Sequence, residues 1–303
     1  MSSTLLHLRF PFSYFFLPVY LFALGISTSF DESRLFWSFL ITHFMLYPST
    51  NGYNSYFDKD EKSIGGLKNP PPVNIGLYYV SILLDVAAII IAYWKISVLF
   101  STMILIFGLV SKAYSHPSIR LKRYPILGWL TVGIFQGCFA FMMCCVGISN
   151  LKIENLMNSR IIIPASLTTI MFLGSYPMTQ VYQHEEDAKH GDMTMSRFLG
   201  IRGTFILALV IFAIATIGFI FYFDSFFALE FGSVFLISIM PVVVFMMIWF
   251  SQVLRDSSKV DYTRTMWLNF ISATCLNIFF IYFLQTNSSV VKYLNSLHTA
   301  LPS

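Results

Sequence analysis

Long apolar runs separated by short polar segments dominate the sequence, and their length is its most informative feature. A helix that crosses the hydrocarbon core of a bilayer requires about 20 consecutive apolar residues. Nine runs approach that length, and turn-forming residues separate several of them, including three consecutive prolines at 70–72. The pattern predicts an all-α, polytopic membrane protein with nine transmembrane helices at about 11–29, 35–56, 74–94, 97–113, 125–147, 161–182, 203–223, 229–250 and 266–286.

The composition supports this class and excludes others. Hydrophobic residues make up 56% of the 303 positions and charged residues 11%, against about 25% charged residues in soluble domains. The formal net charge of +4 is small and the basic residues are scattered, so no nucleic-acid partner is expected. The four cysteines lie in apolar runs without metal-ligand spacing, and we interpret them as packing residues.

Basic residues are distributed unevenly between the two predicted faces of the membrane. With nine spans, 14 of the 19 Lys and Arg residues lie on the side of the N-terminus and of the loops after the second, fourth, sixth and eighth spans. The positive-inside rule places this side in the cytoplasm. Short loops and the lack of an Arg- and Ser-rich leader favour a bacterial inner (plasma) membrane as the location of the protein.

Two stretches at the ends of predicted helices carry clusters of acidic residues. Residues 53–62 and 182–187 each begin with a tyrosine and a side-chain amide, and an aspartate follows four positions after the amide. Asn54 and Asp58 therefore share one face of a helix. Oxygen ligands of this kind suit Mg²⁺, whose coordination is usually completed by water and substrate phosphates. Since both clusters lie on the predicted cytoplasmic face, we expect them to share a metal-bound anionic ligand.

The predicted loop at 114–123 supplies cations on the same face of the membrane. It contains Arg120, Lys122 and Arg123, together with Tyr114 and two serines. Such a set of side chains can bind a diphosphate. The competing interpretation is a topology signal, which needs only basic residues close to the membrane.

The order and spacing of these motifs resemble those of the UbiA superfamily of intramembrane prenyltransferases. The resemblance covers the whole chain, and it rests on Asn54-x3-Asp58 with Asp60, on the loop from Tyr114 to Lys122, and on Gln183-x3-Asp187-x3-Gly191. It implies nine helices around a central cavity that opens to the lipid and the cytoplasm. The repeat of the two acidic motifs suggests one domain over 1–303, built from two four-helix halves (about 11–113 and 125–250) and a ninth helix (about 266–286).

The resemblance also implies an activity and a set of site residues. The reaction is the Mg²⁺-dependent transfer of a prenyl group from a polyprenyl diphosphate to a lipophilic acceptor within the membrane, with an aromatic acceptor favoured and diphosphate released. Asp58 and Asp187 are the implied catalytic residues. The implied metal ligands are Asn54, Asp58, Asp60, Gln183, Glu186 and Asp187. The implied diphosphate contacts are Tyr114, Arg120 and Lys122.

The sequence departs from the usual family pattern at two positions. Lys62 stands where the first motif usually has a further aspartate, and Gln183 stands where the second motif usually begins with aspartate. Asp60, Glu61 and Glu186 can compensate for the missing carboxylates. Alternatively, Lys62 contacts the diphosphate directly.

Two other functions stay open at this point. The chain could be a relative that binds isoprenoids without turnover, because two carboxylates of the pattern are missing. It could also be a small-molecule membrane transporter, which charge pairs at the membrane midplane and broken helices would favour. Asp85 is the one charge that the sequence places deep in a span, and the acids cluster at one face, which favours the enzyme.

Overall fold

The apolar runs of the sequence form helices, because only a helix satisfies all its backbone hydrogen bonds within a single lipid-embedded segment. The computed structural model describes residues 3–29 and 31–287. Its α-helices are α1 (Ser3–Leu8), α2 (Leu17–Ile26), α3 (Glu32–Leu40), α4 (Tyr47–Asp58), α5 (Ile75–Lys95), α6 (Val98–Ser115), α7 (Pro125–Val132), α8 (Ala140–Ser149), α9 (Ser159–Gln180), α10 (His184–Lys189), α11 (Met195–Phe226), α12 (Leu229–Arg255) and α13 (Tyr262–Asn287). The short helical turns are η1 (Phe10–Phe16), η2 (Ile41–Leu46), η3 (Leu121–Arg123), η4 (Gly133–Phe139), η5 (Ile153–Met157) and η6 (Ser257–Lys259).

Within the described residues, eight helices are long and apolar enough to cross a membrane, one fewer than the nine predicted. The difference lies in the second predicted span. This segment is helical from the start of α3 through η2 to the end of α4, but it is more polar than the other spans. Several polar side chains of α4 are buried or line an internal cavity, so a low mean hydropathy does not exclude this segment from the bundle. The seventh span follows a break in the helix at Gly200 (φ 70°).

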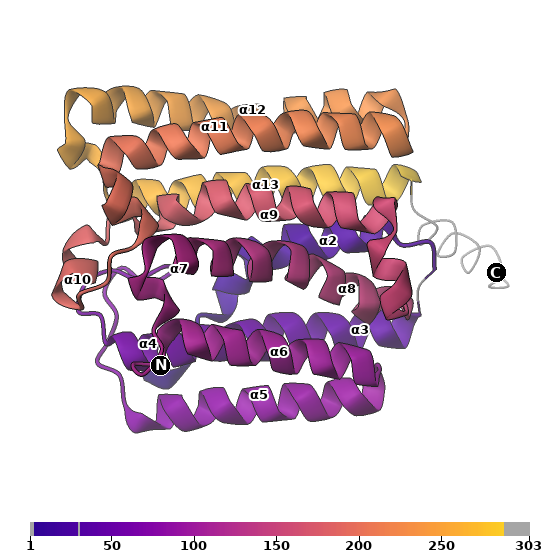
Figure 1. Cartoon of the computed structure of the whole chain (residues 1–303), viewed down its shortest axis with the longest axis horizontal. Coiled ribbons are helices and arrows are strands. Elements are labelled where there is room, and N and C mark those ends of the chain that lie inside the picture. Colours follow the sequence, from indigo (N-terminus) through magenta and orange to yellow (C-terminus); the bar gives the residue numbers. More distant parts are fainter. Residues whose placement is uncertain (1–2, 30, 288–303) are drawn as a thin grey trace, which may run out of the picture.

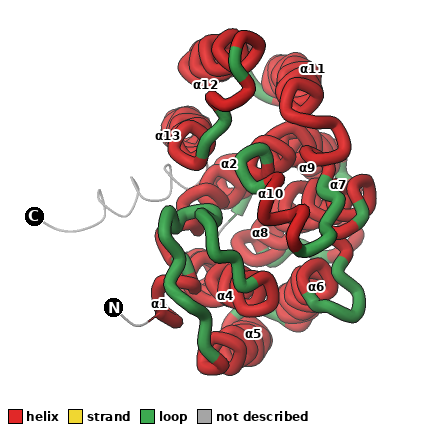
Figure 2. The backbone as a smooth tube through the Cα atoms, turned by 90° about the vertical axis from the view of Figure 1, so that its left-hand side faces the viewer, coloured by secondary structure: helices red, strands yellow, loops and turns green. Residues whose placement is uncertain are grey.

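The long helices run side by side and surround a central region (Figures 1 and 2). One group contains α9, α11, α12, α13 and α2, each packed on the next. A second group contains α4, α5 and α6, and the segment formed by α7, η4 and α8 joins the two groups. The short helix α10 lies at the end of the bundle that faces the viewer in Figure 2.

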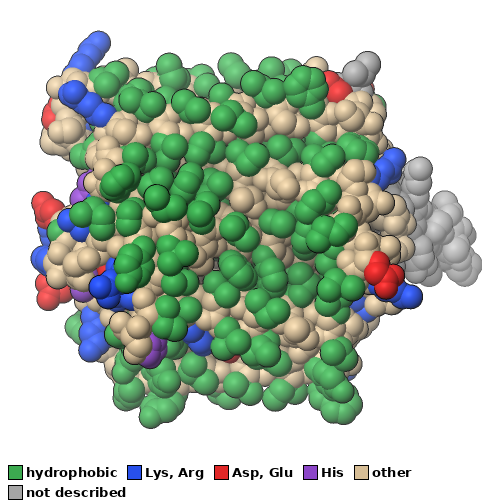
Figure 3. Space-filling model, viewed as in Figure 1, with side chains coloured by type: hydrophobic (Ala, Val, Ile, Leu, Met, Phe, Trp, Pro, Cys, Tyr) green, Lys and Arg blue, Asp and Glu red, His purple; other side chains and the backbone are tan. Residues whose placement is uncertain are grey.

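The surface of the bundle has the distribution of side chains expected for a protein in a bilayer. Figure 3 shows hydrophobic side chains covering the flank of the bundle, whereas Lys, Arg, Asp and Glu gather at its two ends. Exposed apolar side chains such as Leu83, Ile217 and Ile237 lie in the middle of α5, α11 and α12. The chain is therefore an integral membrane protein.

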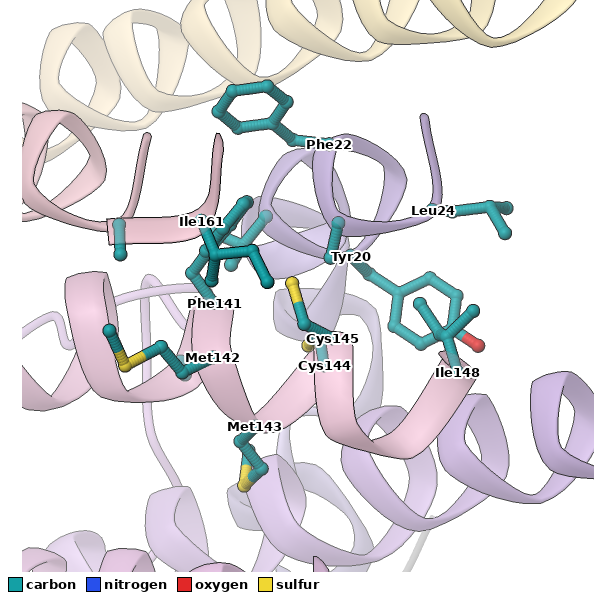
Figure 4. Close-up of a cluster of buried hydrophobic side chains, with 14 of the residues drawn as sticks. Tyr20, Phe22, Leu24, Phe141, Met142, Met143, Cys144, Cys145, Ile148 and Ile161 are labelled. Carbon is teal, nitrogen blue, oxygen red and sulfur yellow. The ribbon is translucent and has the colours of Figure 1, made fainter. Parts of the chain in front are cut away.

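The largest buried cluster packs α8 against α2. Figure 4 shows Cys144 and Cys145 of α8 among Tyr20, Phe141 and Ile148, and both cysteines are free thiols that are almost completely buried. The cysteines thus act as small packing residues, as predicted.

The only charge predicted deep in a span has a partner. The Asp85 carboxylate of α5 forms an ion pair with the Lys112 ammonium of α6, and both side chains are buried. Lys112 also lies 4.9 Å from the centre of the Tyr53 ring, so the pair ties α5 and α6 to α4. The pair compensates both ions between three packed helices, so removal of either partner would leave an unpaired charge inside the bundle.

Two of the spans contain π-helical turns, η2 and η4, which widen the helix and re-aim the side chains that follow. In η4, Gly137 allows close contact with α9: a Cβ at this position would lie 2.5 Å from Thr169 Cα. The backbone N–H of Cys138 donates a hydrogen bond to Thr169 Oγ1 at 2.9 Å in the same contact. This contact holds Phe135 and Gln136 of η4 toward the centre of the bundle, where both line a cavity.

Gly137→Ala is expected to destabilise the protein by about 1–3 kcal/mol, because the added methyl group meets backbone atoms that cannot rotate away. Thermal unfolding of the purified protein in detergent measures the effect. Gly108→Ala is the matched control, since a Cβ there would have an ordinary 3.7 Å contact with Asp85 Oδ1. A Gly137→Ala protein as stable as the Gly108→Ala protein would contradict the proposed close contact.

Candidate active site

One face of α4 lines a cavity of about 250 Å³ near the end of the bundle that carries α10. Tyr47, Asn51, Asn54 and Asp58 all line this cavity, at spacings of four, three and four residues. These spacings place them on one face of the helix, one above the other. The helix ends at Asp58 because Lys59 adopts a left-handed conformation (φ 51°), and the chain then turns so that Asp60 also lines the cavity.

The second acidic cluster lines the same cavity from the side of α9 and α10. Gln183 and Asp187 both face it. Thr194 Oγ1 donates a hydrogen bond of 3.0 Å to Asp187 Oδ2, and the Asp192 backbone N–H donates one of 2.8 Å to the Asp187 carbonyl. The fold therefore brings together two clusters that are more than 120 residues apart in the sequence.

A buried charge network links the loop after α6 to both clusters. Lys122 Nζ lies 2.5 Å from Asp58 Oδ1 and 3.5 Å from Asp192 Oδ2. Arg120 makes a two-pronged contact with Asp192, with Nε–Oδ1 and Nη2–Oδ2 distances of 2.7 and 2.8 Å. Arg120 Nη1 also lies 3.4 Å from Asp58 Oδ1. Lys122 and Tyr114 line the cavity, whereas Arg120 lies behind it, between the two aspartates.

Outside the cavity, ion pairs join the loop after α4 to α10 and the residue that follows it. Lys62 pairs with Glu185, and both side chains are largely exposed. Lys189 lies 3.8 Å from Glu61 and 3.2 Å from Glu186, and His190 Nδ1 lies 3.8 Å from Asp60 Oδ1. Among the side chains expected to contact metal or diphosphate, Lys62, Glu186 and Arg120 thus lie outside the lining of the cavity.

The acids of the cavity are held in an unfavourable environment for their negative charge. Burial, together with the neighbouring Asp58 carboxylate, raises the pKa of Asp60 to about 6. Burial also raises the pKa of Asp187 to about 7, although Lys122 and the hydrogen bond from Thr194 act in the opposite direction. A cation bound among these carboxylates would favour their charged form.

The cavity offers oxygen atoms of the type that hold a divalent cation. Carboxylates of Asp58, Asp60 and Asp187 and the amides of Asn54 and Gln183 face it from both sides. In the described part of the chain, no three His, Cys, Asp or Glu side chains are grouped closely enough to hold a metal ion alone. A cation here would share its coordination with a ligand or water, as Mg²⁺ does at phosphate sites.

A larger apolar cavity adjoins the first. It has a volume of about 570 Å³ and lies between η1, α2, η4, α9, α11, α12 and α13. Every described residue that lines it is uncharged. Six residues line both cavities: Phe12, Phe16, Gln136, Tyr176, Thr179 and Asn269. A charged end with metal-type ligands thus continues into an apolar chamber within the bundle.

A model of the UbiA prenyltransferase family matches residues 14–281. The chain belongs to this family. The match includes both acidic clusters and the basic loop. Residue 9 and the helix α1 lie outside the matched region.

Solved structures of UbiA homologues share the fold. A homologue from Archaeoglobus fulgidus bound to DMAPP and Mg²⁺ is 17% identical, with a TM-score of 0.69 over 94% of this chain and 100% of that chain. An apo homologue from Aeropyrum pernix K1 is 17% identical, with a TM-score of 0.69 over 89% of this chain and 97% of that chain. A digeranylgeranylglyceryl phosphate synthase is 15% identical, with a TM-score of 0.58 over 93% and 96% of the two chains. A comparison with curated protein sequences found no match.

Two charged residues of this UbiA family member have roles that the sequence did not reveal. Arg9 is 8% exposed and lines the polar cavity, where Nη1 donates to the Gly65 carbonyl at 2.8 Å and Nη2 to the Asn51 carbonyl at 3.2 Å. The sequence indicated only a topology charge, since no motif surrounds Arg9. Asp192 is 1% exposed and holds Arg120 and Lys122. The only sequence feature that could have indicated this role of Asp192 is its position five residues after Asp187.

Proposed function

We propose that the protein transfers a prenyl group from a polyprenyl diphosphate to a lipophilic acceptor within the membrane, and that this reaction requires Mg²⁺. The observation that carries the proposal is the union of the two acidic clusters with Lys122 in one cavity that continues into an apolar chamber. The charged end suits a diphosphate, and the apolar chamber suits a prenyl chain. Membership of the family and the homologue structures bound to DMAPP or GPP with Mg²⁺ support the same donor class.

The residues of the cavity fit Mg²⁺. Asn54, Asp58, Asp60, Gln183 and Asp187 would hold the ion through their side-chain oxygens, with the diphosphate completing its coordination. Glu186 is 4% exposed and pairs with Lys189, so it would support these ligands without contacting the ion itself. When bound, the ion neutralises the negative charge that develops on the departing diphosphate.

The diphosphate contacts follow from the cations that reach the cavity. Lys122 and Arg9 line it, and so does Tyr114, whose hydroxyl can donate a hydrogen bond. Arg120 is engaged by Asp192 and Asp58, so its part in the proposal is to position Asp58. Lys62 is left out of the diphosphate site because its ammonium pairs with Glu185 at the surface.

The polarity of the lining places the diphosphate at the charged end of the cavity and the prenyl group toward the apolar chamber. The charged end stabilises the diphosphate as the allylic C–O bond breaks, and the aromatic faces of Phe16 and Tyr176 lie at the junction of the cavities, where the allylic cation would form. The apolar walls exclude water from that cation. After the acceptor attacks, its proton leaves toward the charged end, where the carboxylates of Asp58 and Asp187 line the cavity.

We also propose an orientation. The end of the bundle that carries the site contains α10 and the basic loop after α6, which belong to the side with most of the Lys and Arg residues. By the positive-inside rule this end faces the cytoplasm, and the membrane that we propose is a bacterial plasma membrane. Labelling of single cysteines introduced at positions 62 and 152 in intact cells would distinguish this orientation from the reverse.

Binding of labelled geranyl diphosphate to the purified protein, with and without Mg²⁺, tests the proposed function. We expect Mg²⁺-dependent binding, and release of diphosphate once pooled lipophilic phenols and alcohols are added. Binding without release from any acceptor would support a relative that binds isoprenoids without turnover. The absence of binding would overturn the proposal and favour a transporter.

Arg9→Gln is expected to weaken Mg²⁺-dependent binding of geranyl diphosphate about tenfold or more, because a charge-assisted hydrogen bond to phosphate is lost. Arg9→Lys should recover part of the affinity. Lys62→Gln is the matched control, since its cation lies outside the cavity, and it should change the affinity less than twofold. Equal effects of Arg9→Gln and Lys62→Gln would exclude Arg9 from the diphosphate site.

A further inference from the structure

The apolar chamber follows the axis of the bundle. Asn269 of α13 lines the chamber where it joins the polar cavity, and Phe280 lines it 11 residues further along the same helix. On α9 the same separation divides Thr179, at the junction, from Thr168. At 1.5 Å per residue, the chamber therefore extends for about 16 Å from the junction toward the end of the bundle opposite α10 (Figure 1).

Packed helices surround this length of the chamber. The helix α9 packs on α11, α11 on α12, α12 on α13 and α13 on α2. The turn η4 and the helix α8 complete the ring, because η4 packs on α9 and α8 packs on α2. Figure 2, which looks along the bundle, shows α13, α12, α11 and α9 following one another in this order. A chain bound in the chamber therefore extends along the bundle axis, toward the residues at the far end.

Three phenylalanines close the far end of the chamber, and we call them the aromatic floor. Phe22, Phe219 and Phe280 come from α2, α11 and α13, all line the chamber, and are at most 3% exposed. The rings of Phe22 and Phe280 are stacked with centroids 4.5 Å apart, and the centroids of Phe22 and Phe219 are 5.8 Å apart. The floor thus joins three of the helices that form the walls.

A second layer of aromatic rings lies beneath the aromatic floor. Phe223 is completely buried, and its ring centroid lies 6.0 Å from Phe22, 5.1 Å from Phe279 and 5.3 Å from Phe283. Protein interiors are packed as densely as organic crystals, so additional methylene groups force the surrounding side chains out of their preferred rotamers. A ligand that reaches the floor cannot extend further without this cost.

Smaller side chains contribute to the walls between the junction and the floor. Ala213 and Thr216 of α11 and Ser272 and Ala273 of α13 line this part of the chamber. They leave width for a methyl-branched chain, whereas the floor blocks the path of that chain with three rings. The chamber therefore discriminates between prenyl chains by their length.

We propose that the aromatic floor limits the prenyl donor to about three isoprene units, so that the protein selects geranyl and farnesyl diphosphate over geranylgeranyl diphosphate and longer donors. An extended isoprene unit contributes four C–C bonds to the chain and has a length of about 5 Å, so about three units fill the 16 Å between the junction and the floor. The inference rests on the proposed prenyl transfer, since it assigns the chain length of the donor in that reaction.

The test compares geranyl, farnesyl and geranylgeranyl diphosphate, which differ by one isoprene unit at each step. Each competes with labelled geranyl diphosphate for the full-length protein in nanodiscs with Mg²⁺, and empty nanodiscs give its partition into lipid. Affinities are expressed per mole fraction of donor in the lipid, because partition alone favours longer chains. We expect farnesyl diphosphate to bind at least as tightly as geranyl diphosphate, and geranylgeranyl diphosphate to bind about tenfold more weakly than farnesyl diphosphate.

Two substitutions should move the limit in opposite directions. Phe22→Leu removes ring atoms from the floor and should raise the affinity for geranylgeranyl diphosphate about fivefold, with that for geranyl diphosphate unchanged. Thr216 lies three residues before Phe219, about 4.5 Å nearer to the junction, so Thr216→Phe shortens the chamber by about one isoprene unit. It should weaken farnesyl diphosphate about tenfold and geranyl diphosphate less than twofold. Because Thr216→Phe leaves the floor intact, it tests the limit even if Phe22→Leu fails to fold.

Phe205→Leu is the matched control, because Phe205 is also a buried phenylalanine of a wall helix but packs on Trp249 and lines neither cavity. It should leave the order of the three affinities unchanged. Geranylgeranyl diphosphate that binds the wild type as tightly as farnesyl diphosphate, or an unchanged affinity for farnesyl diphosphate in Thr216→Phe, would overturn the inference. Mg²⁺-dependent binding of all three donors with equal affinity refutes the floor alone, whereas a lack of Mg²⁺-dependent binding by any donor refutes the proposed function as well.

Discussion

Asp58→Asn is expected to reduce Mg²⁺-dependent release of diphosphate by on the order of 10³-fold, and Asp187→Asn by a similar factor. Both carboxylates line the polar cavity from opposite sides, and each substitution removes one negative charge where a divalent cation would be held. The amide keeps the size of the side chain, so the loss concerns charge and metal ligation. The rate is measured with geranyl diphosphate and pooled uncharged acceptors, over a range of Mg²⁺ concentrations.

The control for these variants is Glu185→Gln. Glu185 belongs to the same acidic stretch as Asp187, but its side chain is exposed and pairs with Lys62 outside the cavity. It should retain activity within about twofold, because exposed ion pairs contribute little. Wild-type rates in Asp58→Asn and Asp187→Asn would show that the two acidic clusters are not the site of the reaction, whatever their proximity.

The choice of asparagine follows from the network around Asp58. Its carboxylate is 2% exposed and contacts both Lys122 and Arg120. Alanine would leave these cations without one of their two aspartates, and a loss of activity could then reflect a damaged fold. Asparagine still accepts a hydrogen bond from Lys122, so stability and catalysis can be separated by measuring thermal unfolding beside the rate.

Sequence patterns predicted the helices and the grouping of the two acidic clusters, because both depend on local regularities. Apolar length marks a span directly, and Asn54 and Asp58 share a helix face through spacing alone. The polar second span is the exception: α4 carries serine, threonine, asparagine and aspartate because it lines a cavity, and hydropathy alone cannot separate a cavity-lining helix from a surface one.

The roles of the cations could not be predicted from the sequence, because they depend on which basic side chains line the cavity and which form ion pairs elsewhere. Arg120 and Lys122 are two residues apart, yet Arg120 turns to Asp192 and Lys122 to the cavity. Lys62 follows Asp58 by four residues but pairs at the surface with Glu185. Arg9 reaches the cavity only because the chain turns at its left-handed backbone (φ 47°) between α1 and η1.

The departures from the family pattern have different consequences in space. Gln183 still lines the cavity and offers an amide oxygen, so the second cluster loses charge but keeps a ligand atom. Lys62 lies outside the cavity, where its ion pair with Glu185 joins the loop after α4 to α10. We therefore expect the charge of the metal site to depend on Asp58, Asp60 and Asp187, the three carboxylates that line the cavity.

Asp192→Ala is expected to destabilise the protein by about 3–5 kcal/mol, the cost of leaving buried cations without their counterion. Asp192 is 1% exposed, and it binds Arg120 through two hydrogen bonds and lies 3.5 Å from Lys122. Asp58 would then be the only carboxylate in contact with Arg120 and Lys122. The backbone hydrogen bond from Asp192 to Asp187 would also be weakened, because the side chain that holds residue 192 in place is gone. Denaturant-induced unfolding in mixed micelles measures the loss of stability.

Two comparisons make the result specific. Asp192→Asn keeps one hydrogen-bond acceptor for Arg120 and should lie between the wild type and Asp192→Ala. Glu61→Ala removes an exposed carboxylate that lies 3.8 Å from Lys189, and should cost no more than about 1 kcal/mol. If Asp192→Ala were as stable as Glu61→Ala, the contacts of Asp192 with Arg120 and Lys122 would contribute nothing to the stability of the fold.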